Sequence, residues 1–137
     1  MMEEAKRSIL FVCVENAGRS QMAEAFARKY GLTASSAGSV PAPKVNPTVV
    51  RAMQEDGIDI SRKKPKMLTN EMIEEADLVV TMGCSVEAVC PRPVLAKMRK
   101  KLIEWNLGDP KGKSLEEARK IRDEIEANVR ALSERRG

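Results

Sequence analysis

A cysteine and an arginine separated by five residues, Cys13 and Arg19, form the pattern in this sequence with the clearest chemistry. The residues between them are small or polar, and good helix formers follow from Gln21 onward. The backbone N–H groups of such a loop, together with the start of a helix, bind anions. A guanidinium adds a planar set of donors that matches a tetrahedral oxyanion, and the same positive field favours the thiolate form of a cysteine. The pattern therefore predicts a nucleophilic sulfur at an oxyanion site.

The loop of residues 14–18, called the Cys13 loop below, is the centre of this predicted site. Ser20 follows Arg19 and can donate its hydroxyl to the sulfur, which steadies the sulfur as nucleophile and later as leaving group. We expect the substrate to contact Val14, Glu15, Asn16, Ala17, Gly18, Arg19 and Ser20. The simpler alternative is a small buried cysteine at the end of a strand, with a surface arginine nearby.

A nucleophile that attacks an oxyanion needs an acid to protonate the departing oxygen, and the chain contains no histidine. Asp109 is the best candidate because it follows a predicted strand in a loop bounded by glycine and proline. Its carboxyl can overhang the strand ends while Pro110 stiffens the backbone. Read alone, Asp-Pro is a common turn element, and that structural role is the alternative.

The other two cysteines, Cys84 and Cys90, raise a separate question. Zinc binding is not expected, because a closed zinc site needs four ligands and the chain offers no histidine to complete it. Two small buried residues are the plain alternative. A redox pair explains more, since thiol–disulfide exchange can pass oxidation from Cys13 to Cys84 and then to Cys90.

The order of predicted elements indicates an α/β protein. Apolar β-branched runs predict strands at 9–12, 32–36, 77–82 and 102–106, and residues 37–43 and 58–68 are expected to be loops. Helical periodicity and capping signals predict helices at 20–30, 46–57 and 70–76, and a last one that opens with a capping box at Ser114. Strands that alternate with helices predict a three-layer domain, a four-stranded parallel sheet flanked by helices. Ligands bind beyond the carboxyl ends of such strands.

Length and charge restrict the remaining possibilities. The 137 residues suit one domain over 1–137, and the net charge of +4 favours anionic partners. The basic runs at 62–66 and 97–101 are typical of solvated surface, so no nucleic-acid partner is expected. The N-terminal segment is too polar for a signal peptide or a membrane span. We therefore expect a cytoplasmic monomer that does not bind membranes.

Several segments closely resemble the thioredoxin-coupled arsenate reductases, which share a fold with the low-molecular-weight protein tyrosine phosphatases. The resemblance covers nearly the whole chain and is carried by residues 13–25, 36–38, 45–47, 77–81, 84, 90–91, 105 and 109–110. It implies that Cys13 attacks arsenate and that Cys84 displaces arsenite by forming a disulfide with Cys13. Cys90 then attacks Cys84, and thioredoxin or another dithiol reduces the last bond. Arg19 would clamp the oxyanion, and Asp109 would act as the acid.

Three departures from the family pattern stand out. The spacing from Cys84 to Cys90 differs from the family's, which bears on the order of the relay. Glu15 occupies a loop position where glycine or histidine is usual, and its carboxylate weakens anion binding unless it turns outward. Some of these reductases bind potassium near the loop. Asn16, Glu24 and Ser36 match that site, but Lys66 stands near the position of the remaining acidic ligand. We therefore expect the Lys66 ammonium to replace the cation, with no metal or cofactor bound.

Two alternatives to a reductase stay open. A low-molecular-weight tyrosine phosphatase would use the same Cys13, Arg19 and Asp109, with a phosphocysteine intermediate. It normally frames a phenyl ring with aromatic side chains, and none occurs at 40–43 or 109–112. This favours a small inorganic oxyanion, arsenate or phosphate, with phosphatase side activity remaining plausible. The second alternative is a non-catalytic oxyanion-binding or redox-sensing module.

Overall fold

The computed structural model describes residues 8–82 and 102–135. Its centre is a four-stranded parallel sheet with the spatial order β2-β1-β3-β4. The strands are β1 (Ser8–Cys13), β2 (Thr33–Gly38), β3 (Leu78–Met82) and β4 (Leu102–Trp105). The predicted fold class is confirmed, and the four predicted strands are present within one or two residues of their predicted bounds. Because every strand runs the same way, the carboxyl ends of all four lie at one edge of the sheet.

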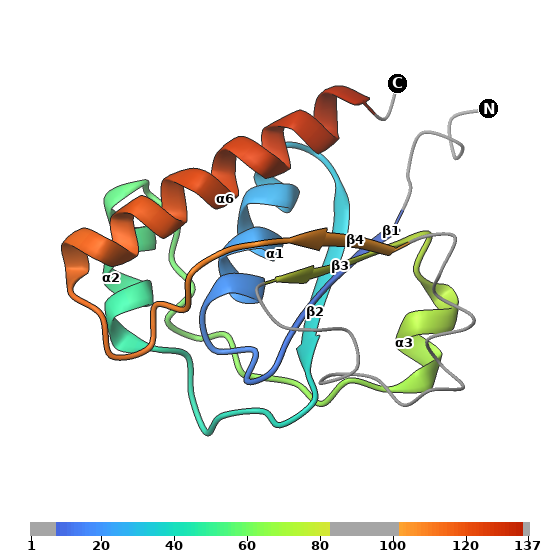
Figure 1. Cartoon of the computed structure of the whole chain (residues 1–137), viewed down its shortest axis with the longest axis horizontal. Helices are drawn as coiled ribbons and strands as arrows, with labels where there is room; N and C mark the ends of the chain where they lie inside the picture. The colour runs from blue at the N-terminus through green and yellow to red at the C-terminus, as the bar shows by residue number, and fades with distance from the viewer. Residues whose placement is uncertain (1–7, 83–101, 136–137) are drawn as a thin grey trace.

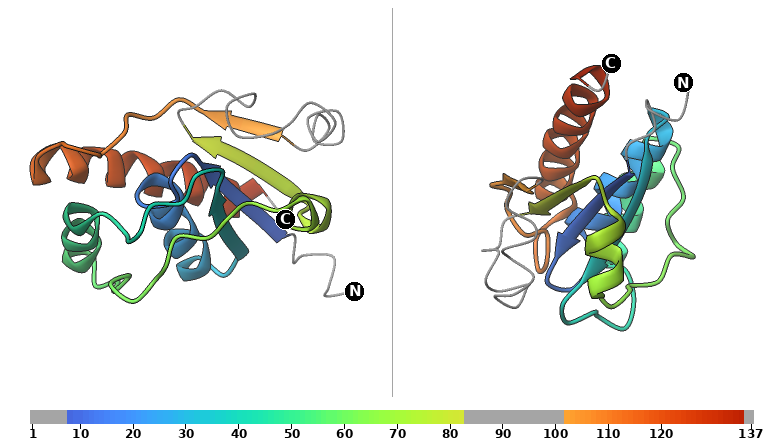
Figure 2. Two further views of the ribbon diagram at one scale, coloured as in Figure 1. Left: turned by 90° about the horizontal axis from the view of Figure 1, so that it is seen from below. Right: turned by 90° about the vertical axis from the view of Figure 1, so that its right-hand side faces the viewer.

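Both faces of the sheet are covered, which is why β1 is apolar at successive positions. Ile9 and Phe11 pack into the larger core, to which α1, α2 and α6 contribute their apolar side chains, whereas Leu10 and Val12 pack into a smaller core with residues of α3. Figures 1 and 2 show α6 running across α1 and α2, with α3 away from them. The predicted three layers are therefore present.

The helices lie within one or two residues of the bounds that the local signals indicated. They are α1 (Arg19–Lys29), α2 (Pro47–Glu55), α3 (Asn70–Glu75) and α6 (Leu115–Arg135). Gly31 follows α1 with φ of 84°, a conformation that favours glycine. The Asn46 side chain accepts from Thr48 N at 2.9 Å at the start of α2, and Ser114 forms the predicted capping box with Glu117 before α6.

The end of β2 differs from the prediction. A loop was expected from Ala37, yet the strand continues through Gly38, which pairs with Cys13. Gly38 also exchanges backbone hydrogen bonds with a neighbouring segment: its N–H donates to Lys66 O, and its C=O accepts from Leu68 N, each at 2.8 Å. These added hydrogen bonds hold Gly38 in an extended strand, although glycine was expected to loosen the backbone there.

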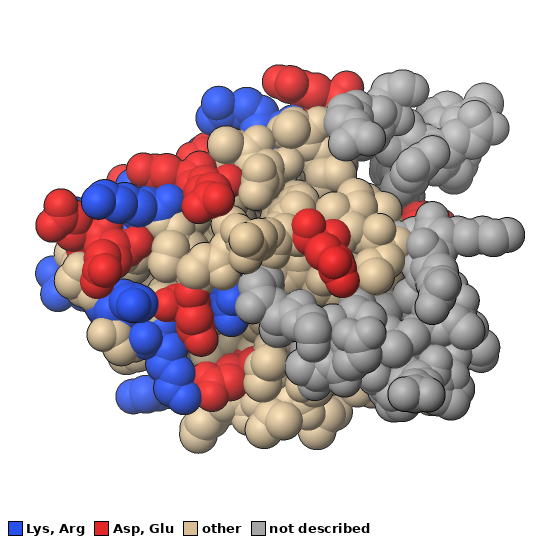
Figure 3. Space-filling model, viewed as in Figure 1, with Lys and Arg blue, Asp and Glu red and all other residues tan. Residues whose placement is uncertain are grey.

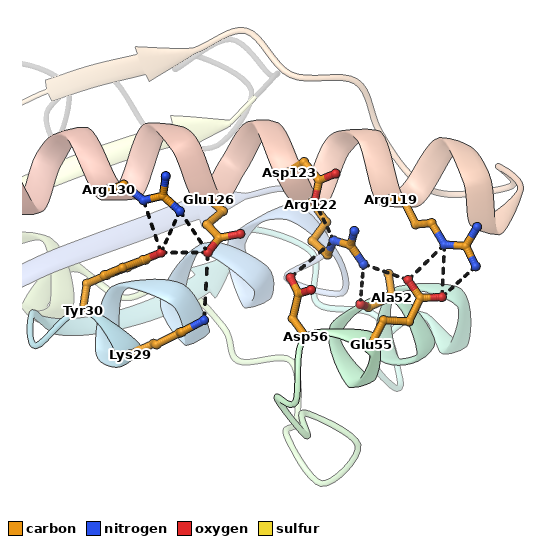
Figure 4. A network of polar contacts seen from close by, with 10 residues as sticks. All are labelled: Lys29, Tyr30, Ala52, Glu55, Asp56, Arg119, Arg122, Asp123, Glu126 and Arg130. Atoms are coloured by element: carbon orange, nitrogen blue, oxygen red, sulfur yellow. Dashed lines mark hydrogen bonds and ion pairs between the residues drawn. The ribbon is translucent and has the colours of Figure 1, made fainter.

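A network of ion pairs joins α6 to α1 and α2 (Figure 4). Glu55 of α2 accepts from Arg119 at 2.7 Å and from Arg122 at 2.8 Å, and Arg122 also donates to Ala52 O at 2.9 Å. These two guanidinium groups lower the pKa of Glu55 from its ordinary 4.5 to about 2. Arg122 is nearly buried, so its charge is offset within the fold by carboxylates.

Basic and acidic side chains are interspersed on the face shown in Figure 3. This distribution agrees with solvated surface rather than with a basic binding stripe. Within the described ranges, no helix combines the length and the apolar character that a membrane span requires.

The close approach of Gly38 to the Cys13 loop yields a test of the fold. A Cβ added at Gly38 would lie 2.5 Å from Val14 O and 2.9 Å from Asn16 N. Because both atoms are backbone, we expect Gly38→Ala to lower the free energy of unfolding by about 1–3 kcal/mol in urea. Gly108→Ala is the control, since its Cβ would meet only Ile121 Cδ1 at 3.7 Å. Equal stability of the two variants would contradict the assigned packing.

The Glu55 contacts yield a second test, based on pH. A carboxylate whose pKa is lowered by folding contributes fully above its unfolded pKa, and the contribution is lost as pH falls toward the folded pKa. We therefore expect the stability difference between the parent and Glu55→Gln to shrink as the pH falls from 4.5 to about 2 in urea denaturation. The exposed Glu124→Gln variant on α6 is the control. A difference that stays constant over this range would show that the ion pairs do not form in solution.

Candidate active site

The Cys13 sulfur lies at the carboxyl end of β1, where the chain turns into the loop that precedes α1. The side chain is buried, with 3% of its surface exposed. Its Sγ lies 2.9 Å from Ser20 Oγ and accepts a hydrogen bond from Asn16 N at 3.2 Å. The strand, loop and helix predicted from the sequence thus place a hydroxyl and a backbone N–H at the sulfur, where both can stabilise negative charge.

The carbonyl groups of the Cys13 loop point away from the site. Three of them accept hydrogen bonds from the segment of residues 40–46, called the outer segment below. The pairs are Val40 N to Val14 O at 2.8 Å, Ala42 N to Glu15 O at 3.0 Å, and Asn46 N to Ala17 O at 2.9 Å. Because the C=O and N–H of a planar trans peptide point in opposite directions, the N–H groups of residues 15, 16 and 18 are directed to the inner side of the loop. That arrangement of donors suits an anion.

Asn16 holds the loop in shape. It has φ of 53°, a left-handed conformation that asparagine tolerates better than most residues, and it is fully buried. Its Nδ2 donates to Ser20 Oγ at 2.7 Å, and its Oδ1 accepts from Gln21 Nε2 at 3.1 Å and from Lys66 N at 2.9 Å. Asn16 therefore fixes the orientation of the serine hydroxyl that contacts the sulfur.

Arg19 reaches from the start of α1 to the loop of residues 107–113, called the Asp109 loop below. Its Nη1 donates to Leu107 O at 3.3 Å, and its Nη2 lies 3.6 Å from Asp109 Oδ2. The Arg19 side chain is 9% exposed and the Asp109 side chain 57% exposed. The guanidinium is thus held from two sides, while the carboxyl faces solvent and can exchange protons with it.

These groups line a pocket of about 440 Å³. Five residues of the predicted contact set take part in the lining: Val14, Glu15, Ala17, Gly18 and Arg19. Asn16 and Ser20 are instead fully buried behind the loop, where they support the sulfur. The predicted nucleophile, clamp and acid, Cys13, Arg19 and Asp109, are brought together here.

Part of the pocket wall was not predicted. It comes from the outer segment, from the start of α2 and from the Asp109 loop: Ala42, Lys44, Asn46, Pro47, Pro110 and Lys111. Because residues 37–43 follow a parallel strand, the rule that ligands bind at the carboxyl ends would have pointed to them. The other two cysteines, Cys84 and Cys90, lie outside the described residues.

A buried carboxylate, Glu24, lies behind the site on α1 and is 1% exposed. Its Oε1 accepts from Ser36 Oγ at 2.6 Å, and its Oε2 lies 3.0 Å from Arg28 Nη2 and 3.4 Å from Lys63 Nζ. The expectation that Lys66 supplies the ammonium is wrong. Lys63 occupies that place, while Lys66 is exposed and contributes its backbone N–H to Asn16. Two cationic side chains therefore already balance the carboxylate, so the residues present do not fit a potassium ion.

The sequence of the chain matches one known protein family over nearly its whole length. Residues 8–136 match the family model described as low molecular weight phosphotyrosine protein phosphatase. The chain belongs to this family. Within it, the chain is 40% identical to an arsenate reductase of Brevibacillus brevis, over 96% of this chain and 97% of the relative.

Solved structures of family members agree with this placement. The solved structure of an arsenate reductase in the phosphate binding state is 32% identical in sequence, with a TM-score of 0.83 over 96% of this chain and 99% of that chain. The YwlE arginine phosphatase of Geobacillus stearothermophilus is 26% identical, with a TM-score of 0.80 over 93% and 91%. The resemblance predicted from the motifs is confirmed.

The Glu24 contacts yield a prediction about potassium. Replacing Lys63 by methionine removes one of two cations from a buried carboxylate, so we expect Lys63→Met to lower the free energy of unfolding by about 1–2 kcal/mol. Lys64→Met, at an exposed neighbour, should change it by less than about 0.5 kcal/mol. The parent should have the same urea midpoint in KCl and in NaCl at equal ionic strength. Strong stabilisation of the parent by potassium alone would contradict this account.

Proposed function

We propose that this protein is an arsenate reductase in which Cys13 is the nucleophile and a dithiol reductant restores the enzyme. The observation that carries the proposal is the convergence of Cys13, Arg19 and Asp109 on one pocket whose loop directs N–H groups inward. A tetrahedral oxyanion can accept those N–H groups together with the guanidinium of Arg19. The similarity to arsenate reductases over nearly the whole chain gives independent support.

The first step is nucleophilic substitution at arsenic. The Cys13 thiolate forms an S–As bond, an As–O bond breaks, and the departing oxygen takes a proton from Asp109 and leaves as water. Ser20 Oγ at 2.9 Å and Asn16 N at 3.2 Å hold the sulfur in place for the attack. Arg19 balances the charge of the oxyanion throughout this step. Its Nη2 lies 3.6 Å from Asp109 Oδ2, so the guanidinium and the acid are neighbours at the site.

The second step is reduction by thiol–disulfide exchange. Cys84 attacks the Cys13 sulfur, the electron pair of the S–As bond stays on arsenic, and arsenite leaves with arsenic reduced from the +5 to the +3 state. Cys90 then attacks Cys84, which frees Cys13, and an external dithiol reduces the Cys84–Cys90 bond. This relay is supported by the presence of Cys84 and Cys90 in the sequence and by the family resemblance, which also suggests thioredoxin as the dithiol.

The pocket wall favours a small inorganic substrate. Among the described residues that line it, none is aromatic. A phenyl ring gains part of its binding energy from stacking on aromatic side chains, which the described part of this wall does not offer. Arsenate carries no such group and loses nothing by their absence.

A phosphatase is the second candidate, because the same three groups suit attack on a phosphoryl group. A pocket of about 440 Å³ is larger than a bare oxyanion requires, and the fold also matches an arginine phosphatase. In this case Cys13 forms an S–P bond, Asp109 protonates the leaving group, and water hydrolyses the intermediate. Neither Cys84 nor Cys90 is needed.

The experiment that separates the two measures arsenate-dependent NADPH oxidation with thioredoxin and thioredoxin reductase, alongside hydrolysis of an aryl phosphate. We expect turnover of arsenate by the parent and a loss of at least about 100-fold in Cys13→Ser, Cys84→Ser and Cys90→Ser. Hydrolysis should be slow and should be lost only in Cys13→Ser. Hydrolysis that is retained in Cys84→Ser and Cys90→Ser would show that both variants are folded.

Two outcomes would contradict the proposal. Efficient hydrolysis without arsenate turnover, unchanged in Cys84→Ser and Cys90→Ser, would identify a phosphatase. Oxyanion binding with neither reaction would identify a binding or redox-sensing module.

A further inference from the structure

The Cys13 loop carries a carboxylate at the place where an anion binds. Glu15 lines the pocket, and its backbone C=O accepts a hydrogen bond from Ala42 N at 3.0 Å. The Glu15 backbone cannot move away from the pocket without breaking that hydrogen bond. Two negative charges less than about 10 Å apart repel each other measurably, because salt at physiological strength screens only over about 8 Å. An uncompensated Glu15 would therefore oppose the binding of an oxyanion.

The side chain of Glu15 is compensated by a residue far away in the sequence. Lys111 Nζ donates to Glu15 Oε2 at 2.9 Å, across 96 residues of chain. The hydrogen bond to Glu15 and the charge of Glu15, with a smaller effect from Asp109, raise the pKa of Lys111. The contact with Glu15 therefore favours the charged form of the Lys111 ammonium.

Lys111 also belongs to the Asp109 loop. Its backbone N–H donates to Asp109 Oδ1 at 3.0 Å, and Pro110 packs closely enough against Gly18 that a Cβ there would lie 2.9 Å from the ring. One residue thus orients the candidate acid with its backbone and reaches the Cys13 loop with its side chain. The ion pair connects the two loops on the rim of the pocket that both of them line.

The charges around the pocket show what this pair does for an anion. The described residues that line it include three cations, Arg19, Lys44 and Lys111, and two carboxylates, Glu15 and Asp109. Arg19 faces Asp109 at 3.6 Å, and Lys111 faces Glu15 at 2.9 Å. Without Lys111 the positive excess disappears, and the carboxylate of Glu15 is left unpaired on the loop that must hold the oxyanion.

We propose that Lys111 is a positioning residue for oxyanion binding: its ammonium neutralises Glu15 on the Cys13 loop and joins that loop to the Asp109 loop. The inference rests on the proposed oxyanion chemistry of the site and applies equally to arsenate and to phosphate. Its distinctive consequence is that the importance of Lys111 depends on the presence of Glu15. A lysine that only added positive charge near the pocket would matter equally with or without the carboxylate.

The test is a double-mutant cycle on the binding of inorganic phosphate, measured by calorimetry with the full chain. We expect Lys111→Met to weaken binding about tenfold, because it exposes the oxyanion to the Glu15 carboxylate. Glu15→Gln alone should leave the affinity within about threefold of the parent, and Glu15→Gln with Lys111→Met should restore it to within about threefold. The tenfold loss should shrink in 1 M salt, where screening acts over about 3 Å.

Lys113→Met is the matched control, since it removes the same charge from the same loop at an exposed position. It should weaken phosphate binding less than about twofold, and all variants should melt within about 2 °C of the parent. An equal loss in Lys111→Met and Lys113→Met, or a loss in Lys111→Met that persists when Glu15 is glutamine, would overturn the inference. So would a parent that binds no phosphate at millimolar concentration. Phosphate binding that follows the cycle without any arsenate turnover would sustain this inference while the proposed reductase function failed.

Discussion

The site depends on one backbone constraint, the left-handed conformation of Asn16. That conformation costs about 1–2 kcal/mol for an ordinary residue. Here the cost is offset by hydrogen bonds from both ends of the side chain and from the backbone N–H, which reaches the Cys13 sulfur at 3.2 Å. The constraint turns the peptide so that its N–H faces inward, and the outer segment holds the neighbouring carbonyl groups on the other side. The shape of the anion site is thus set by Asn16, which lies buried behind the loop, together with the outer segment that forms part of the pocket wall.

The polar groups behind the loop follow the same logic of compensation. An unpaired buried carboxylate behind an anion site would make the electrostatic potential there more negative and so oppose anion binding. Glu24 instead meets Arg28, Lys63 and Ser36, and Arg122 of α6 meets Glu55 of α2. Buried charges are costly unless they are paired and hydrogen-bonded, so each pair also fixes the relative placement of the elements that carry it. Among the described residues, these buried charges thus each have an oppositely charged partner, while the residues that line the pocket carry three cations and two carboxylates.

Local signals in the sequence were sufficient for the elements and for the nucleophile. The apolar run before Cys13, the cap at Asn46 and the capping box at Ser114 all act within a few residues, so the strands and helices could be placed from them. The parallel sheet then predicted that Cys13 and Asp109 meet at one edge. Long-range contacts could not be read in the same way: the pairing of Gly38 beyond the predicted strand end, the choice of Lys63 over Lys66, and the Glu15–Lys111 contact. Each depends on the exact path of a loop, which no local periodicity encodes.

The distances along the chain between the parts of the site bear on how it forms. The Cys13 loop is local to β1 and α1, but its shape is completed by residues 40–46, by Lys66 and by the Asp109 loop, up to 96 residues away. Such non-local contacts form late in folding, because loop-closure entropy must be overcome first. The β1–β3 pairing is non-local too, with Ile9 opposite Leu78, so the sheet and the completed site both depend on contacts that form after the local helices. An oxyanion that binds only the completed site shifts the folding equilibrium toward the native state by mass action. The substrate therefore stabilises the native protein.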